Sequence, residues 1–476
     1  MSISVVRSPA QSALDTYTIE PGHSRFKECL SASPPSRRTT PDSQADDRDD
    51  QDDSVPDGGI AAWLIVVGGW CAMFSSYGWL HSIGVFQNYY QNVMFPGYPA
   101  STIAWIPSFE VFFMLALGPI VGRLSDTFGP RAVVIGGSFF HIFGVMMASI
   151  STKYYQILLA QGICSPIGLC AIAQPVLSVI PDWFNKRRGL AYGIISSSSG
   201  IAGIILPIMV NRLIPKVGFG WAMRIVAFMM LFFLIIAGLT VRERVPPRPE
   251  VLNRENLVHP FRDVNMVLLL AGGTLLSFGI WVPSNYIVTS SLAVGMQNNL
   301  LQYLVSIQNA GSLFGRFFSG FFADKIGVYN SFISSTVCSG ILVLALWIPG
   351  TNNSAIISFD VLFGVTSGAY YTIFVALVAP IAPPREIGYW VGLNFFFASI
   401  AGLVTGSIGG AILAYDGGSY WGMKVYSGVL LLAGSVFVMG TRLRLTGLAV
   451  FFASLHDTGM ETKNWSLREV DDALVV

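Results

Sequence analysis

The sequence predicts an all-α membrane protein with twelve transmembrane helices in two pseudo-symmetric six-helix bundles. About a dozen apolar stretches each have the roughly 20 residues that a helix needs to cross the hydrocarbon core of a bilayer. The composition agrees, because 53% of the 476 residues are hydrophobic, only 12% are charged and the mean hydropathy is +0.58. A charged segment also divides the apolar stretches into two groups of six.

The elements follow in chain order. Residues 1–57 are rich in Ser, Pro and Asp, which predicts a disordered cytosolic tail, because such a segment buries too little apolar surface to fold. No cleavable signal peptide is expected. The N-terminal bundle is expected at 58–241, a cytosolic linker at 242–264, the C-terminal bundle at 265–440 and a cytosolic tail at 441–476. The spans are expected at 60–88, 101–122, 131–150, 155–179, 188–210, 221–241, 265–288, 300–321, 329–349, 355–379, 387–413 and 421–440.

The positive charges predict the orientation. Twelve spans place both termini on one side, and most of the 28 Lys and Arg residues also lie on that side. Five lie on the other side, namely Lys153, Arg212, Lys216, Arg224 and Lys424. Because cytoplasmic loops carry the excess of basic residues, both termini are expected to be cytosolic. A short apolar patch, Leu448 to Leu455, would lie on the membrane surface or pack under the bundle.

Several classes of function are disfavoured. The five cysteines (Cys29, Cys71, Cys164, Cys170 and Cys338) lie in the tail or in apolar stretches, so neither a disulfide framework nor a zinc site is expected. No phosphate-binding loop or metalloenzyme motif occurs in the sequence, so we expect no enzyme activity, no ATP hydrolysis and no cofactor. The net charge of +1 gives no reason to expect nucleic acid as a partner.

One motif recurs in both halves. The spacing Gly-x-x-x-Asp-x-x-Gly occurs between the second and third spans and again between the eighth and ninth. We expect each aspartate to lie at the start of the next helix, where the helix dipole favours an anion, and the second glycine to permit a tight turn. Arg123, Arg131 and Lys325 would pair across the two halves. The predicted cytosolic gating motif comprises Gly122, Arg123, Asp126, Gly129, Arg131, Gly320, Asp324, Lys325 and Gly327.

At this motif the sequence resembles the major facilitator superfamily, over about residues 57–440. The resemblance implies the major facilitator fold and transport by alternating access. Two further stretches are similar to the paired signatures of the monocarboxylate porter family. Together they make the chain resemble a fungal-type member of that family. The first stretch precedes the first span, and the second enters the fifth span as an aromatic pair, a basic triplet and a small-residue helix. The signature residues are Asp57, Gly58, Trp63, Lys186, Arg187, Arg188 and Gly193.

Arg316 is the foremost candidate for cargo binding, and the alternative is a side chain that snorkels to the inner interface. It precedes Asp324 by eight residues, so it should lie about 12 Å deeper in the membrane at 1.5 Å per residue. Gln308 and Ser312 share its helical stripe, and a guanidinium suits a carboxylate or carbonyl group. The resemblance also implies a substrate-binding arginine here, with an aspartate four residues earlier as its proton-linked partner. Ser312 stands at that place, so strict proton symport is not expected.

His81 is a second departure from the family. It lies on a stripe with Tyr77 and Asn88 in the first span, where the resemblance implies a substrate-binding lysine. A histidine titrates near neutral pH, so His81 is a candidate proton carrier, and the alternative is a histidine satisfied at the outer interface.

Other polar residues fall inside apolar stretches. Glu110 is close to mid-membrane by count, and it would carry a proton, pair with Arg224 or Arg316, or be a carboxylate bonded within the bundle. Asp360 is expected at the outer interface and His141 as a packed histidine. Asn285, Asn309, Tyr370 and Asn394 would line the same cavity or join helices.

The main prediction is a secondary active or facilitative transporter of a small organic molecule, a monocarboxylate or a related organic acid, in the plasma membrane. Its other partners would be protons and the lipid bilayer, and no accessory membrane protein is indicated. The alternatives are an efflux pump for a fungal secondary metabolite, which would fit the aromatic richness, and a nutrient receptor that does not transport. Asn352 begins a glycosylation sequon in a short outward loop.

Overall fold

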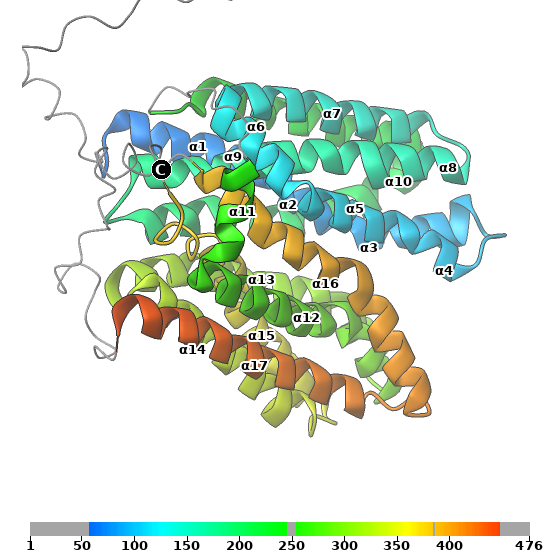
Figure 1. Cartoon of the computed structure of the whole chain (residues 1–476). Helices are drawn as coiled ribbons and strands as arrows, with labels where there is room; N and C mark the ends of the chain where they lie inside the picture. The colour runs from blue at the N-terminus through cyan, green and yellow to red at the C-terminus, as the bar shows by residue number, and fades with distance from the viewer. Residues whose placement is uncertain (1–56, 245–253, 384–385, 448–476) are drawn as a thin grey trace, which may run out of the picture. The chain divides into compact units, whose positions relative to one another are not determined.

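The computed structural model describes residues 57–244, 254–383 and 386–447, and in these ranges every regular element is helical (Figure 1). The predicted tail at 1–57, apart from Asp57, and the apolar patch from Leu448 to Leu455 lie outside the described residues. The predicted linker is described in part and contains a helix, α11 (Arg254–Arg262).

The N-terminal bundle contains six spans, two of which include π-helical turns. Its elements are α1 (Ile60–Ser75), α2 (Tyr77–Leu80), α3 (Ile83–Tyr89), the π-helix η3 (Tyr90–Met94), α4 (Ala100–Ile103), α5 (Trp105–Ala116), α6 (Gly118–Phe128), α7 (Pro130–Ile150), α8 (Tyr154–Ile157), the π-helix η4 (Leu158–Cys164), α9 (Ser165–Trp183) and α10 (Arg188–Thr240).

The C-terminal bundle follows α11 and also contains six spans. Its elements are α12 (Val264–Ala293), α13 (Asn298–Ile326), α14 (Val328–Leu342), the π-helix η5 (Val343–Trp347), α15 (Asn353–Ile373), α16 (Ile387–Tyr415) and α17 (Trp421–Thr446).

Two helices explain how the predicted spans map onto the structure. Among the described residues, nine helices are long and apolar enough to cross a membrane, or ten with the pair α5 and α6, which is bent by 41°. The 53-residue α10 accounts for two predicted spans, which meet at Gly218, where φ is 79°. Helix α13 covers the predicted eighth span, but Gln308, Asn309 and Arg316 lower its mean hydropathy.

The two halves repeat one turn. Gly129 joins α6 to α7 with φ 85° and ψ 150°, and Gly327 joins α13 to α14 with φ 88° and ψ 146°. Both glycines take left-handed φ values that side chains with a Cβ disfavour. The second glycine of each motif copy therefore makes the tight turn that the sequence predicts. The end of the bundles that holds these two turns is called the motif end below.

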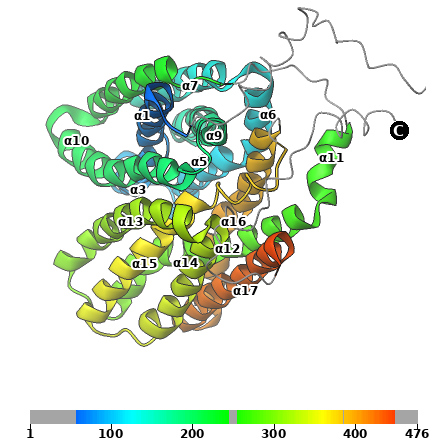
Figure 2. The ribbon, with the colours of Figure 1, turned by 90° about the vertical axis from the view of Figure 1, so that its left-hand side faces the viewer.

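The bundles contact each other mainly where α10 packs on α13 and where α5 and α6 pack on α16, with smaller contacts of α10 with α15 and of α9 with α16 (Figure 2). Glycines permit the close approach, because a Cβ on Gly320 would clash with the backbone oxygen of Gly189. A Cβ on Gly118 would lie 2.7 Å from the backbone oxygen of Gly392. Small residues at such crossings let helix backbones pack directly against each other in a membrane.

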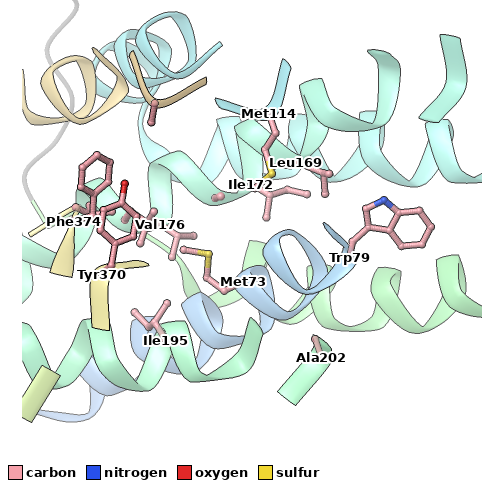
Figure 3. Packing of buried hydrophobic residues seen from close by; sticks show 14 of the residues in the cluster. Met73, Trp79, Met114, Leu169, Ile172, Val176, Ile195, Ala202, Tyr370 and Phe374 are labelled. Carbon is pink, nitrogen blue, oxygen red and sulfur yellow. The ribbon is translucent and has the colours of Figure 1, made fainter. Parts of the chain in front are cut away.

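A single cluster of buried apolar side chains draws on both bundles. Figure 3 labels some of its members, among them Met73 of α1 and Val176 of α9 from the N-terminal bundle and Tyr370 of α15 from the C-terminal bundle. The candidate site described next lies on the helices that carry this cluster.

Candidate functional site

Arg316 of α13 reaches from the C-terminal bundle into the N-terminal bundle. Its side chain is 5% exposed, and its Nε donates to the Ser312 hydroxyl at 3.0 Å. Its Nη1 donates to the backbone oxygen of Ser196 at 3.2 Å and to the hydroxyl of Ser199, both on α10. The stripe that the sequence predicts on this helix is therefore a hydrogen-bonded unit, and it spans the interface between the bundles.

Aromatic rings surround this guanidinium. The Arg316 Cζ lies 5.6 Å from the centroid of the Tyr371 ring on α15, a cation–π geometry. Tyr77 and His81, from the first span, lie close enough to interact with the Arg316 charge. The His81 ring packs against Gly203 of α10, where an added Cβ would lie 2.9 Å from its Cγ. The structure thus brings together three of the predicted site residues, whereas Asn88 is exposed and bonds to Asn92.

Gln308 and Asn309 are buried on the same helix. They are 8% and 7% exposed, and the Nε2 of Gln308 has no hydrogen-bond partner. Helix α15 approaches α13 so closely here that a Cβ on Gly364 would clash with the backbone oxygen of Gln308. A buried amide without a partner is costly, so the free donor of Gln308 sets it apart from its satisfied neighbours Ser312 and Arg316.

Glu110 belongs to a separate network inside the N-terminal bundle. It is fully buried, and its carboxylate accepts hydrogen bonds from Trp79 Nε1 at 2.5 Å and from Gln161 Nε2 at 3.2 Å. The Tyr90 hydroxyl in turn donates to Gln161 Oε1 at 2.5 Å.

These contacts fit the predicted alternative of a carboxylate bonded within the bundle, rather than a pairing with Arg224 or Arg316. Arg224 donates instead to the Ser149 hydroxyl at 3.2 Å, and Arg316 bonds to α10. Gln161 and Tyr90 were missed, although a glutamine within an apolar stretch is a signal that the sequence does contain. Both lie in π-helical turns, a local backbone feature that periodicity does not reveal.

The remaining polar candidates mostly join helices. Tyr370 hydrogen-bonds to Ser277 at 2.9 Å, and Asn394 Nδ2 donates to the backbone oxygen of Phe374 at 3.4 Å. Asn285 is exposed. His141 is fully buried with Nδ1 2.9 Å from the Ser165 hydroxyl, so the prediction of a packed histidine is confirmed.

Asp126 caps a helix of the other bundle. Its two carboxylate oxygens accept from the backbone N–H groups of Gly388, at 3.1 Å, and Tyr389, at 3.0 Å, at the start of α16. The sequence placed this aspartate at the start of the next helix, and the structure corrects that, because Asp126 lies in the last turns of α6. The chemistry is the expected one, a carboxylate at a helix N-terminus, but the helix belongs to the C-terminal bundle.

Asp324 makes the equivalent contact in the opposite sense. Its carboxylate accepts from the N–H groups of Gly189, at 2.7 Å, and Leu190, at 2.8 Å, at the start of α10. The two aspartates thus form a reciprocal pair of caps between the bundles at the motif end.

The basic residues of the motif contribute differently from the prediction. The Arg131 Nε donates to the backbone oxygen of Gly238 at 3.0 Å, within the N-terminal bundle, and Lys325 lies 4.3 Å from the centroid of the Phe321 ring on its own helix. Arg123 interacts electrostatically with Asp126. The hydrogen bonds across the interface at this end come from the two aspartates and from Gln174 of α9, whose Nε2 donates to the backbone oxygen of Gly388 at 3.1 Å.

The two signature stretches touch each other. Asp57 Oδ1 accepts from the backbone N–H groups of Asn185 and Lys186, both at 2.6 Å. The rings of Trp63 and Phe184 meet edge to face with centroids 5.4 Å apart. In the second stretch, Lys186 and Arg187 are exposed, and Arg188 Nε donates to the backbone oxygen of Phe184 at 3.3 Å.

Two glycines of the signatures differ in their packing. A Cβ on Gly193 would lie 3.0 Å from the backbone oxygen of Arg316, so this glycine lets α10 approach the arginine, whereas Gly58 has open space around it. Asn352, the predicted sequon residue, is exposed and directly precedes α15.

The sequence matches the Major Facilitator Superfamily over residues 59–295 and 269–448. It is 53% identical to the MFS transporter asaE of Aspergillus flavus, over 84% of this chain and 91% of that protein. It is 46% identical to the Fujikurins efflux protein of Gibberella fujikuroi, over 83% of this chain and 85% of that protein. The fold is similar to that of the outward-conformation crystal structure of the transporter FucP, with a TM-score of 0.64, 11% identity and coverage of 79% of this chain and 98% of that one.

Proposed function

Since the chain belongs to the Major Facilitator Superfamily and is a multi-pass membrane protein, we propose that it exports a fungal secondary metabolite by alternating access of its two bundles. The observation that carries this proposal is the likeness to a relative named as an efflux protein, the Fujikurins efflux protein, over 83% of the chain. The alternative function of the sequence analysis is thus better supported than uptake of a monocarboxylate. Both relatives are named as transport proteins, and neither is named as an enzyme.

The site around Arg316 supports a cargo that carries an acidic or carbonyl group. A buried guanidinium with five N–H donors recognises such a group through paired hydrogen bonds. Tyr77, Tyr371 and His81 beside it offer ring faces to a larger, more apolar body. We assign cargo binding to this group of residues together with Ser312, Gln308 and Asn309.

The two reciprocal caps at Asp126 and Asp324 support a gate at the motif end. Each cap joins a helix of one bundle to the N-terminus of a helix in the other, so both must break before the bundles can separate there. The excess of Lys and Arg residues on the side of the termini supports a cytosolic position for the gate, both termini and the motif end. The plasma membrane is the site that export requires.

Transport of a short monocarboxylate is the second candidate. The specific observation in its favour is the contact between the two stretches that resemble the monocarboxylate porter signatures, Asp57 with Lys186 and Trp63 with Phe184. Against it, Ser312 rather than a carboxylate lies within hydrogen-bond distance of Arg316. The binding of short acids and of larger metabolites therefore has to be compared directly.

Counterflow in proteoliposomes tests both candidates. The purified full chain is reconstituted, and the exchange of labelled short monocarboxylates and of fujikurins is measured with and without an imposed pH gradient. We expect saturable exchange of the larger metabolite that Arg316→Ala abolishes.

Arg224→Ala is the matched control, because Arg224 is an arginine on α10 that bonds to Ser149, outside the proposed site. Exchange of short acids alone would instead favour the monocarboxylate function. Saturable binding of a compound with no exchange would contradict export and support a receptor that does not transport.

A further inference from the structure

Asp360 is a fully buried carboxylate that the site described above does not include. It lies on α15 about two turns after the helix begins at Asn353, and its side chain is 0% exposed. Among the described residues, neither of its carboxylate oxygens has a hydrogen-bond partner. The sequence analysis expected this residue at the outer interface, and the structure adds that neighbouring helices cover it.

The packing of α15 on α13 explains the burial. The two helices meet through glycines on both sides, and an added Cβ on Gly364 or Gly368 would clash with the backbone oxygens of Gln308 or Ser312. Asp360 precedes Gly364 by one helical turn and therefore lies on the same face of α15. Asp360 is thus covered where α15 packs against α13. Helix α13 also carries Gln308 and, about two turns further along, Arg316.

A cation near Asp360 is already engaged elsewhere. The Lys424 Nζ of α17 donates to the backbone oxygen of Trp347 at 2.8 Å. The Trp347 ring in turn stacks on Phe359, the residue before Asp360, with centroids 5.3 Å apart and an interplanar angle of 3°. The lysine is therefore bound to this tryptophan, through its backbone oxygen and against its ring, 5.2 Å from the centroid.

In the described part of the chain, no titratable group on the elements packed against α15 is hydrogen-bonded to Asp360 or acts on its charge. On α10, α12, α13 and α14 these groups are Arg188, Tyr192, Arg212, Lys216, Arg224, Tyr286, Tyr303, Arg316, Asp324, Lys325, Tyr329 and Cys338. The same holds for Tyr370 and Tyr371 of α15 itself and for Lys424, Tyr426, Arg442 and Arg444 of α17.

We propose that Asp360 is a proton-binding site that couples the movement of cargo to a proton gradient. An ionised carboxylate in a membrane interior with no donor and no cation costs several kcal/mol, so the side chain holds a proton in the arrangement seen here. Release of that proton requires water or a hydrogen-bond donor at the carboxylate. Either one requires the faces of α13 and α15 to separate.

The coupling runs through α13. This helix carries the face that covers Asp360 and also carries Arg316, so a change in its packing on α15 acts on both the proton site and the cargo site. Because protonation favours the packed arrangement and ionisation favours an opened one, the proton and the cargo bias the same conformational equilibrium. The coupling rests on the proposed function, whereas the protonation of Asp360 does not.

Infrared spectroscopy of the reconstituted full chain tests the protonation without any cargo. Spectra are recorded as the pH is raised from acidic to alkaline. We expect a carbonyl band of a protonated carboxyl, at high frequency because it lacks hydrogen bonds, that persists at neutral pH and is lost in Asp360→Asn. Asp360→Glu should shift the band rather than remove it, which provides a second test should the asparagine variant fail to fold.

Glu110→Gln is the matched control for this experiment. It removes another fully buried carboxyl, but one that accepts hydrogen bonds from Trp79 and Gln161, so the high-frequency band should remain. Identical spectra of the wild type and Asp360→Asn in this region would overturn the proposal.

Transport separates this inference from the proposed function. With the fujikurins and short acids of the counterflow assay, Asp360→Asn should keep exchange but lose accumulation driven by a pH gradient. If the variant still accumulates cargo from the gradient, the coupling is refuted while the exporter stands. If no compound exchanges in the wild type, the proposed function fails, and the infrared band still decides whether Asp360 carries a proton.

Discussion

Asp324 of α13 accepts a hydrogen bond of 2.7 Å from the backbone N–H of Gly189, the second residue of α10. The contact joins a side chain of one bundle to the N-terminus of a helix in the other. Asp126 makes the same contact with Gly388 of α16 in the reverse direction. The interface at the motif end is thus closed twice, each time by a carboxylate and a helix N-terminus.

Removal of both caps should open the motif end. Each carboxylate accepts two backbone bonds, and hydrogen bonds to charged groups contribute about 1.5–3 kcal/mol each. Loss of even one of these bonds, at about 1.5 kcal/mol, corresponds to a factor of about ten, so we expect Asp324→Ala to raise the accessibility of the interface to water by at least that factor.

The measurement is the alkylation rate of a cysteine introduced at Ser196 in a cysteine-free background. The double variant with Asp126→Ala should react faster than either single variant. Equal rates in the wild type and the double variant would show that the caps do not hold this end closed.

The approach of the two bundles should depend on Gly320. Gly320→Ala places a methyl group against the backbone oxygen of Gly189, so the bundles cannot meet as they do in this structure. We expect the variant to fold but to lose cargo exchange in proteoliposomes.

Gly136→Ala is the control for this variant, because Gly136 lies on α7 with nothing within 4 Å of an added Cβ. Retention of exchange in Gly320→Ala would mean that the closed contact is not part of the transport cycle.

Trp79 should stabilise the N-terminal bundle through Glu110. Trp79→Phe leaves the buried carboxylate with Gln161 as its donor, and an unsatisfied buried group costs about 1–3 kcal/mol. We expect a lower midpoint of thermal unfolding. The measurement is the fraction of folded protein that size-exclusion chromatography detects after heating to increasing temperatures.

Trp183→Phe is the matched change, because the buried Nε1 of Trp183 has no partner to lose. A fall in the unfolding midpoint of equal size in both variants would show that the indole hydrogen bond contributes nothing beyond ring packing.

Asp57 should protect the basic triplet from proteases. Its carboxylate accepts hydrogen bonds from the backbone N–H groups of Asn185 and Lys186, while the side chains of Lys186 and Arg187 are exposed. Asp57→Ala should raise the rate of trypsin cleavage at this turn by about tenfold, the effect of losing about 1.4 kcal/mol. Asp416→Ala, at the turn before α17, is a control acidic residue that should leave the cleavage rate unchanged.

The fold could be predicted from the sequence because apolar stretches of membrane length dictate helices, whatever their detailed packing. The turns at Gly129 and Gly327 were predicted for the same kind of local reason. The predicted spans leave room for a loop between the fifth and the sixth, but in the structure the two helices meet at one non-helical residue, Gly218. The π-helical turns at η3 and η4 also could not be predicted, since each depends on a local shift in backbone bonding.

The candidate site was predictable only in part. Arg316 and Ser312 share one helix, so spacing was enough to place them together. The partners Ser196 and Ser199 come from another bundle, and so do the N–H groups that bind Asp126. The place of Asp360 near the start of α15 could be predicted from the sequence, but its burial depends on which helix covers it, and distance along the chain carries no such information.

The bond between Arg316 and the serines of α10 has a thermodynamic consequence. A ligand that takes this guanidinium displaces Ser196 and Ser199, so its binding energy and the separation of α10 from α13 are linked. Linkage is reciprocal. Anything that stabilises the contact between α10 and α13 lowers the affinity of that ligand by the same factor by which the ligand weakens the contact. An inhibitor that clamps the interface from outside would therefore act as a competitor of the cargo without ever touching the arginine.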